Sequence, residues 1–291
     1  MAAAPPSAPT RRGRSARVVA SAVLLVAALA LAGCAQRSEA QGAPPAGPEP
    51  VLEPTVAPPA PTSTTVVAAH PKVLVLGDST MVDVGPALVA ALDAAGAEPV
   101  DAARAGVGLT RFAFEDAPYS PEPEWAVEVD RVRPDLTIVM LGAWDMPFVT
   151  NEGIWPYTEP VQRAMATLTA GGGRVLWLST PTEPGRPDWP MDQVFETSAA
   201  ATGGRVVFAE IDAAVTAPDG TQPPSYVAAD GTVVRLRKSD GFHFCAEGAE
   251  RAAAEIVRLA HVHGLAPPPG GGWQDGPWRE SEHYDFPECD G

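Results

Sequence analysis

Five strand-like runs, separated by stretches with helical periodicity, constrain the fold of this chain more than any other feature. The runs are mostly continuous in hydrophobicity, which is typical of strands that are buried on both faces of a sheet. Such strands form parallel sheets whose connecting helices cover both sides. The expected strands are 72–77, 98–101, 136–142, 174–179 and 205–210.

Helical patterns fill the intervals between these runs. The expected helices are 82–95, 124–132, 159–169, 191–201 and 246–263. The order predicts a flavodoxin-like α/β fold, a three-layer α/β/α sandwich around a five-stranded parallel sheet, with its site at the carboxyl ends of the strands. The folded domain is expected over 72–266, a length that suits one core.

The first 33 residues have the composition of an export signal. Four arginines, of which Arg17 is the last, precede an apolar run over 18–33, shorter than the ~20 residues that a membrane-spanning helix needs. The run ends in LAGC (31–34), which resembles a bacterial lipobox. That resemblance implies cleavage before Cys34, lipid on this residue, and a place on the outer face of the cytoplasmic membrane. A secreted or tail-anchored protein with a stray cysteine is the alternative.

Residues 34–71 are rich in proline and alanine and show no hydrophobic period, so we expect an extended tether. The chain has 20 Lys+Arg and 36 Asp+Glu, a net charge of −16. Loss of residues 1–33, which hold four arginines and no acid, leaves 16 basic against 36 acidic residues, a net of −20. This charge argues against nucleic acid or an anionic membrane surface as a partner. Contact with a membrane is expected through lipid instead.

Three polar residues stand where parallel strands would bring them together. Ser79 follows the first strand, and Asp240 precedes His243 by three residues just before the last helix. A serine hydroxyl needs an adjacent base to act as a nucleophile, and that base needs an orienting carboxylate. Each residue alone has an ordinary structural explanation, as a turn residue, a helix cap or a half-buried polar group. Together they predict a Ser-His-Asp triad.

At these residues the sequence resembles the SGNH (GDSL-type) hydrolases, which are α/β esterases. GDST (77–80) matches their nucleophile block, GVG (106–108) their glycine block, GAWD (142–145) their Gly-x-Asn-Asp block, and DGFH (240–243) their Asp-x-x-His block. The resemblance spans about 72–263. It implies Ser79 as nucleophile, His243 as base and Asp240 as the residue that orients the base.

The resemblance also implies an oxyanion hole, formed by the N–H groups of Ser79 and of Gly108 or Gly106. Trp144 departs from the pattern, because it stands where the family has an asparagine donor. One lost donor typically costs ~10²–10³ in rate, unless the indole N–H replaces it. GAWD at this block resembles SGNH domains attached to membrane O-acyltransferases, which act in acyl transfer to envelope glycans.

Three cysteines are present, and assignment of Cys34 to the lipobox leaves Cys245 and Cys289. In an oxidising compartment we expect a disulfide between them, which would pin the C-terminal tail (267–291) to the domain; two free thiols are the alternative. No metal-binding spacing, dinucleotide fingerprint or phosphate-binding loop occurs in the sequence, so no metal or other cofactor is expected.

Two further features bear on the substrate. Aromatic residues that follow the second and third strands could stack on sugars, although core packing is the more common explanation. They are Tyr119, Trp125, Trp155 and Tyr157. The insert 215–237, with a turn expected at Asp230 and Gly231, could cover the site or be decoration.

The sequence thus predicts a serine esterase that acts on O-acetyl or other short acyl esters of envelope carbohydrate, with an acylated carbohydrate or another small ester as its partner. Acyl transfer to an envelope glycan, beside a membrane acyltransferase partner, is the first alternative, because only the acceptor differs. A carbohydrate-binding or assembly lipoprotein that Trp144 has weakened catalytically is the second.

Overall fold

A computed structural model describes residues 70–113, 119–181, 190–287 and 289. The predicted signal peptide (1–33), Cys34 and nearly all of the predicted tether lie outside these residues. None of the helices in the described ranges combines the length and apolar character that crossing a bilayer requires.

The sheet has five parallel strands in the order β2-β1-β3-β4-β5. This confirms the predicted α/β fold and its topology. The strands are β1 (Lys72–Gly77), β2 (Glu98–Asp101), β3 (Leu136–Met140), β4 (Arg174–Leu178) and β5 (Val206–Ala209). Because all five strands run the same way, their carboxyl ends meet at one edge.

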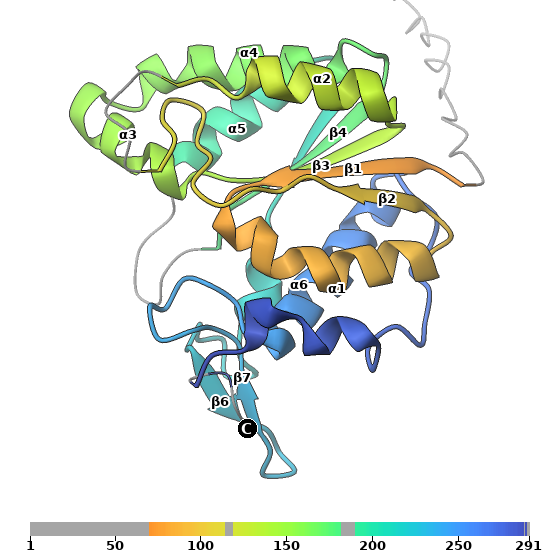
Figure 1. The fold of residues 1–291 in the computed structure, drawn as a ribbon. Coiled ribbons are helices and arrows are strands. Elements are labelled where there is room, and N and C mark those ends of the chain that lie inside the picture. The colour runs from red at the N-terminus through yellow and green to blue at the C-terminus, as the bar shows by residue number, and fades with distance from the viewer. Residues whose placement is uncertain (1–69, 114–118, 182–189, 288, 290–291) are drawn as a thin grey trace, which may run out of the picture. The chain divides into compact units, whose positions relative to one another are not determined.

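Successive side chains of each central strand enter different halves of the core. In β1, Val73 and Val75 pack with α1 and α6, whereas Leu74 and Leu76 pack with α2, α4 and α5. These helices form the two outer layers in Figure 1. The helices are α1 (Ser79–Ala94), α2 (Glu122–Val132), α3 (Met146–Glu152), α4 (Thr158–Thr169), α5 (Pro190–Ala200) and α6 (Ala246–Val262).

The structure adds two features to the predicted fold. The short α3 lies between the 3₁₀ helices η1 (Ala143–Asp145) and η2 (Trp155–Tyr157), after β3. The insert forms an antiparallel hairpin of β6 (Ser225–Val227) and β7 (Val233–Arg235), and Gly231 has φ +88 in the expected turn. Arg251 of α6 holds this hairpin by donating to the Tyr226 hydroxyl at 2.9 Å.

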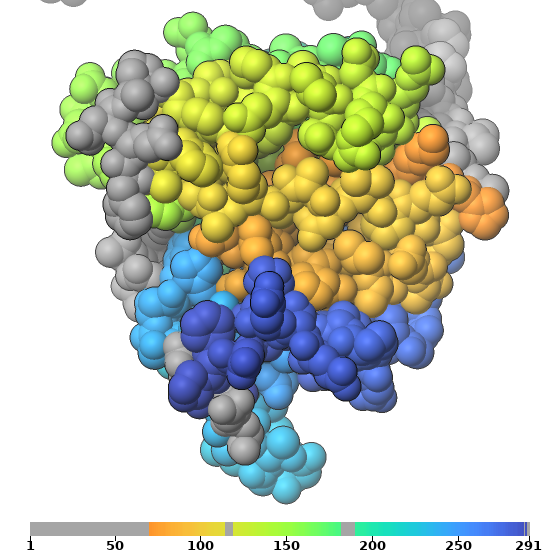
Figure 2. All heavy atoms as spheres, viewed as in Figure 1, coloured from red at the N-terminus to blue at the C-terminus, as the bar shows by residue number. Residues whose placement is uncertain are grey.

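The C-terminal segment (267–289) packs against α1 rather than trailing away from the domain. It contains η4 (Pro277–Glu280) and η5 (Glu282–Tyr284). Trp278 and Tyr284 are buried in the same half of the core as α1 and α6. Figure 2 shows this segment, in dark blue, lying against the orange residues of α1. Through these buried aromatic side chains, a tail rich in proline and glycine contributes to the core.

Candidate active site

Ser79 lies at the turn from β1 into α1. A Cβ atom at Gly77 would lie 2.2 Å from the carbonyl oxygen of Met140, so this strand end accepts only glycine without a shift. Buried Asp78 caps α1, because its Oδ1 accepts hydrogen bonds from the N–H (3.0 Å) and hydroxyl (2.7 Å) of Thr80. Ser79 is therefore presented at a helix N-terminus, where unpaired N–H groups favour negative charge.

Asp78 also ties this turn to the neighbouring strand end. The N–H of Gly142, two residues after β3, donates to Asp78 Oδ2 at 3.2 Å. Burial raises the pKa of Asp78, and the hydrogen bonds from Thr80 and Gly142 oppose that rise. The segment that leads to Trp144 therefore starts beside the nucleophile turn.

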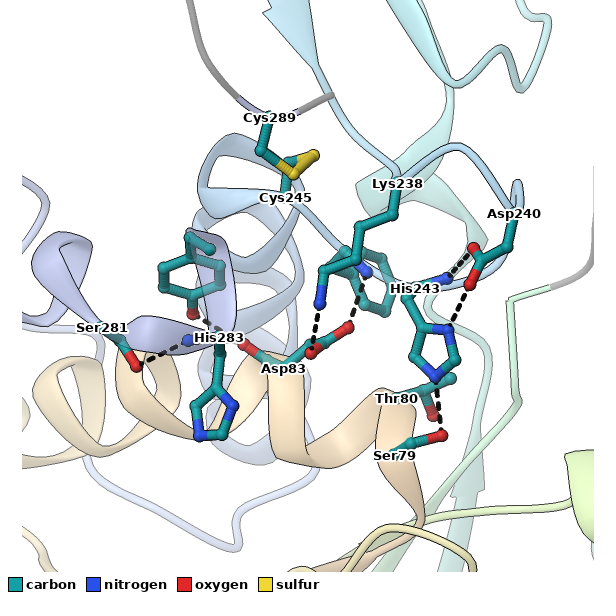
Figure 3. A network of polar contacts seen from close by, with 12 residues as sticks. Ser79, Thr80, Asp83, Lys238, Asp240, His243, Cys245, Ser281, His283 and Cys289 are labelled. Carbon is teal, nitrogen blue, oxygen red and sulfur yellow. Dashed lines mark hydrogen bonds and ion pairs between the residues drawn. A yellow bond between two sulfur atoms is a disulfide. The ribbon is translucent and has the colours of Figure 1, made fainter. Parts of the chain in front are cut away.

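The three predicted triad residues lie in a continuous hydrogen-bonded row (Figure 3). The His243 Nε2 atom is 2.7 Å from Ser79 Oγ, and His243 Nδ1 is 2.6 Å from Asp240 Oδ2. The His243 side chain is 29% exposed and that of Asp240 is 50% exposed, so the row is open to solvent. The geometry is that of a nucleophile, a base and a residue that orients the base.

The loop that carries His243 holds the Asp240 carboxylate in place. Asp240 Oδ1 accepts the N–H groups of Phe242 (2.8 Å) and His243 (3.0 Å), while Oδ2 faces the imidazole. Burial acts to raise the pKa of Asp240, but the hydrogen bonds from the His243 ring and from these two N–H groups outweigh it. The net effect is a pKa below the ordinary value. Asp240 is therefore kept ionised opposite the ring nitrogen.

The predicted oxyanion glycines lie in a narrow turn, the glycine loop (104–113). Gly106 has φ +87, and Val107 pairs with Phe112 as an antiparallel bridge. The N–H of Gly108 donates to the carbonyl of Arg111 at 2.9 Å. The oxyanion role of Gly108 or Gly106 therefore stays a prediction, and for Gly108 it requires this hydrogen bond to be exchanged.

Buried Asp145 anchors the glycine loop. Its carboxylate accepts the N–H groups of Leu109 and Thr110 (each 2.8 Å), the Thr110 hydroxyl (2.6 Å) and the Tyr157 hydroxyl (2.8 Å). Its Oδ1 would lie 2.8 Å from a Cβ atom at position 108, so only glycine fits there without a shift. Burial raises the pKa of Asp145, and the hydrogen bonds from Thr110, Leu109 and Tyr157 oppose that rise. Sequence reasoning quoted Asp145 within GAWD but gave it no role.

Trp144 lies in η1, between Gly142 and Asp145, and is half-buried. Its neighbours in the chain contact both the nucleophile turn and the glycine loop. A role of the indole N–H in the oxyanion hole stays a prediction.

The four aromatic residues proposed to stack on sugars differ in solvent exposure. Tyr157 and Trp125 are buried in the core, which agrees with the more common explanation for such residues. Tyr119 is half-buried, and its hydroxyl accepts a hydrogen bond from Arg104 at 2.7 Å. Trp155 is 66% exposed and is the member of this set most accessible to a ligand.

A cavity of about 380 Å³ lies beside the strand end that precedes Ser79. Its lining includes Gly77, Val107 and Trp125, with Arg104 and Glu124 as charged members. A larger hollow of about 1070 Å³ opens at the amino-terminal edge of the sheet, around Pro134 and Arg174. We regard the smaller cavity as relevant to the site, because the larger one lies at the edge opposite the triad.

Cys245 and Cys289 form the predicted disulfide, with their Cα atoms 5.3 Å apart. Cys245 follows His243 by two residues and is the N-cap residue of α6, so the bond joins the C-terminal segment to the start of α6, next to His243. Among the residues that the structure describes, no group of three or more His, Cys, Asp or Glu side chains is arranged to hold a metal ion.

Sequence reasoning missed a buried ion pair next to the triad. Lys238 Nζ lies 3.0 Å from Asp83 Oδ1, and both side chains are almost fully buried. A signal was available, because Asp83 is the one charged residue on the buried face of α1, which apart from Thr80 is otherwise apolar.

No curated protein matches the chain significantly. Among solved structures it is similar to a carbohydrate acetylesterase from Sinorhizobium meliloti (14% identity, 66% of this chain and 99% of that one, TM-score 0.46). It is also similar to the periplasmic domain of a lipopolysaccharide acetyltransferase from Salmonella ser. Paratyphi A (12%, 67% and 86%, TM-score 0.48). A third similar structure is a psychrotrophic esterase from Pseudoalteromonas sp. (11%, 67% and 99%, TM-score 0.47).

A family model described as "Protein of unknown function (DUF459)" matches residues 72–259. The matched range holds the sheet, the glycine loop and all three predicted triad residues, and it covers more than half of the chain. The chain therefore belongs to the DUF459 family.

Proposed function

We propose that this protein is an SGNH-type serine esterase that removes acetyl or other short acyl groups from carbohydrate of the cell envelope. The observation that supports the proposal most is the row of two short hydrogen bonds, from Ser79 Oγ to His243 Nε2 and from His243 Nδ1 to Asp240. The SGNH resemblance of the sequence supports the choice of ester chemistry, and the carbohydrate substrate rests on that resemblance alone.

The reaction would proceed through an acyl-enzyme. Ser79 Oγ attacks the ester carbonyl carbon while His243 Nε2 takes the hydroxyl proton, and Asp240 stabilises the imidazolium that forms. His243 then returns the proton to the leaving alcohol as the ester bond breaks. Water attacks the acyl-enzyme in the second step, with His243 again as the base, and the acid is released.

The oxyanion would form at the N-terminus of α1. The Ser79 N–H is in the first helical turn, where the helix provides no acceptor, so it is a suitable donor to the oxyanion. The second donor would come from Gly108, after exchange of its bond to Arg111, from Gly106, or from the Trp144 indole.

The test is hydrolysis of p-nitrophenyl acetate by the purified full-length chain, beside Ser79→Ala and the matched control Ser225→Ala, an exposed residue of β6. We expect turnover by wild type and the control, and a loss of at least ~10³-fold in Ser79→Ala. A fluorophosphonate should label wild type on Ser79. A folded wild type that neither hydrolyses the ester nor becomes labelled contradicts the proposal. Glycan binding by such a protein would favour the carbohydrate-binding lipoprotein instead.

Acyl transfer to an envelope glycan is the second candidate, and Trp144 is the observation that favours it. The sequence block GAWD resembles that of SGNH domains attached to membrane O-acyltransferases, and transfer differs from hydrolysis only in the acceptor. Competition between water and an added glycan acceptor distinguishes the two. If the acyl-enzyme passes its acyl group mainly to a glycan hydroxyl although water is in excess, the protein is an acyltransferase.

We also propose that the protein is exported and lipid-anchored through Cys34, as the lipobox resemblance implies. The test is metabolic labelling with an alkyne fatty acid in the cells that make the protein. We expect label on wild type and none on Cys34→Ala. Equal labelling of both would contradict the anchor.

A further inference from the structure

The buried ion pair joins the nucleophile helix to the loop that carries His243. Asp83 lies one turn after Ser79 on α1 and is 4% exposed, and Lys238 is 8% exposed. Asp83 Oδ1 faces Lys238 Nζ at 3.0 Å, and Oδ2 accepts the N–H of Phe244 at 2.9 Å. The two oxygens of one carboxylate therefore hold both ends of the segment 238–244.

Hydrogen bonds within the same segment join its two ends. The N–H of Lys238 donates to the carbonyl of His243 at 2.8 Å, and Arg237 pairs with Phe244 as an isolated bridge. The Arg237 guanidinium donates to the carbonyls of Gly241 (3.1 Å) and Phe242 (3.3 Å). We call residues 237–244 the catalytic loop. Because this loop is internally tied, a contact at its two ends sets the position of the imidazole as a unit.

The C-terminal segment contacts both members of the ion pair. The Tyr284 hydroxyl donates to the carbonyl of Asp83 at 2.6 Å, and Lys238 Nζ lies 4.2 Å from the centre of the Phe286 ring. The disulfide from Cys245 to Cys289 holds this segment at its far end. The C-terminal segment therefore lies against both Asp83 and Lys238.

A buried ion pair is a costly way to obtain stability alone. Removal of two charges from water costs much of what their attraction returns, and apolar replacements are often as stable. Here burial raises the pKa of Asp83, while the charge and hydrogen bond of Lys238 and the nearby charge of His243 oppose that rise. An apolar pair could not make directional contacts. The Asp83 carboxylate does so, because it binds Lys238 Nζ at one end of the loop and the Phe244 N–H at the other.

We infer that Asp83 and Lys238 are positioning residues, which hold the catalytic loop on α1 so that His243 Nε2 meets Ser79 Oγ. The C-terminal segment completes this arrangement by contacting Asp83 and Lys238. The inference rests on the proposed esterase function, but its structural part can be measured without turnover.

The experiment compares wild type with the double variant Asp83→Asn/Lys238→Met. This variant removes both buried charges together and keeps an acceptor for the Phe244 N–H. The matched control is Glu255→Gln/Arg258→Met, which removes a partly exposed ion pair of α6 (2.6 Å), with Arg258 51% and Glu255 15% exposed. Each protein is assayed for kcat and KM with p-nitrophenyl acetate, for Tm, and for amide hydrogen exchange of the catalytic loop.

We expect the double variant to keep a Tm close to that of wild type while kcat falls ~10–100-fold, because a displacement near 1 Å at the reacting atoms costs that much. KM should change less than about twofold. Amide exchange in the catalytic loop should accelerate at least ~10-fold, and the control should match wild type throughout. A double variant with wild-type kcat, or with wild-type exchange in the loop, overturns the inference.

Two further readouts keep the outcomes distinct. If wild type neither hydrolyses esters nor labels on Ser79, the proposed function fails, and loop exchange still decides the positioning role. If the double variant does not fold, Lys238→Arg and Lys238→Met decide it, because arginine keeps the charge pair. We expect kcat to fall less than ~3-fold in the first and more than ~10-fold in the second. Equal kcat values in the two would overturn the inference.

Discussion

Replacement of Asp145 by alanine tests how the glycine loop is held. The buried carboxylate accepts four hydrogen bonds, from the N–H groups of Leu109 and Thr110, the Thr110 hydroxyl and the Tyr157 hydroxyl. The Thr110 hydroxyl can rotate to another partner. The two N–H groups have no such freedom, and the Tyr157 hydroxyl is fully buried, so we expect Asp145→Ala to leave three buried or half-buried donors without an acceptor.

The size of the effect follows from this count. Each buried donor left without a partner costs about 1–3 kcal/mol. Burial of the Asp145 carboxylate is itself unfavourable and raises its pKa. Because the variant removes this carboxylate, it recovers that cost, which offsets part of the lost stability. We therefore expect the free energy of unfolding to fall by roughly 3–5 kcal/mol. For a domain of this size that corresponds to a Tm decrease of roughly 6–20 °C.

The assay is urea and thermal unfolding of Asp145→Ala beside Asp130→Asn, which replaces an exposed carboxylate of α2 and should stay within ~0.5 kcal/mol of wild type. Below the melting range the Asp145 variant should also lose esterase activity, because the segment that carries Gly106 and Gly108 is no longer fixed. A loss below ~1 kcal/mol, or equal to that of the control, would refute the view that this carboxylate anchors the glycine loop.

Three other predictions concern the disulfide, the triad carboxylate and the nucleophile turn. Cys289→Ser opens a bond that spans 44 residues and should lower the free energy of unfolding by about 2–4 kcal/mol; a reducing agent should bring wild type to the same value, and unchanged stability would contradict this. The pKa of Asp240 is lowered in the folded protein, so its contribution to stability is present above the ordinary value of 3.8 and is lost as the pH falls through the folded-state pKa. The Tm difference between wild type and Asp240→Asn should therefore shrink between pH 6 and pH 3, and a constant difference would be evidence against it. Gly77→Ala places a Cβ atom 2.2 Å from the carbonyl oxygen of Met140 and should abolish activity, whereas Gly271→Ala, which meets open space, should match wild type in activity and Tm.

Most of the fold could be predicted because its signals are local. The predicted bounds of β1 and β2 match the observed ones, and those of β4 and β5 agree within one residue at each end. The third strand ends at Met140, two residues before its predicted end. Helix α1 begins at Ser79 rather than at the predicted Val82, because the Asp78 cap starts the helix before the apolar stripe does. Helix α3 (Met146–Glu152) was not predicted, since it is short and has Pro147 in its first turn.

The proximity of Ser79, His243 and Asp240 was also accessible from sequence, for a topological reason. Parallel strands bring their carboxyl ends to one edge, so Ser79 after β1 and a histidine just before α6 meet although 164 residues separate them. Hydrogen bonds between loops have no such rule. Two examples depend on the path of the glycine loop. The Gly108 N–H donates to the carbonyl of Arg111, and the Asp145 carboxylate accepts the N–H groups of Leu109 and Thr110.

The arrangement of carboxylates shows why the remaining residues escaped prediction. Asp78, Asp83 and Asp145 are all buried, and each joins segments that are distant in the sequence: the turn after β1 to Gly142, α1 to the catalytic loop, and η1 to the glycine loop. Since burial alone disfavours a carboxylate, each is retained only where several donors converge on it. An apolar pattern locates strands and helices because one residue type suffices at each position, whereas a buried carboxylate needs partners from elsewhere in the chain. By the inference above, an acidic residue outside the predicted triad, Asp83, contributes to holding the His243 imidazole 2.7 Å from the Ser79 hydroxyl.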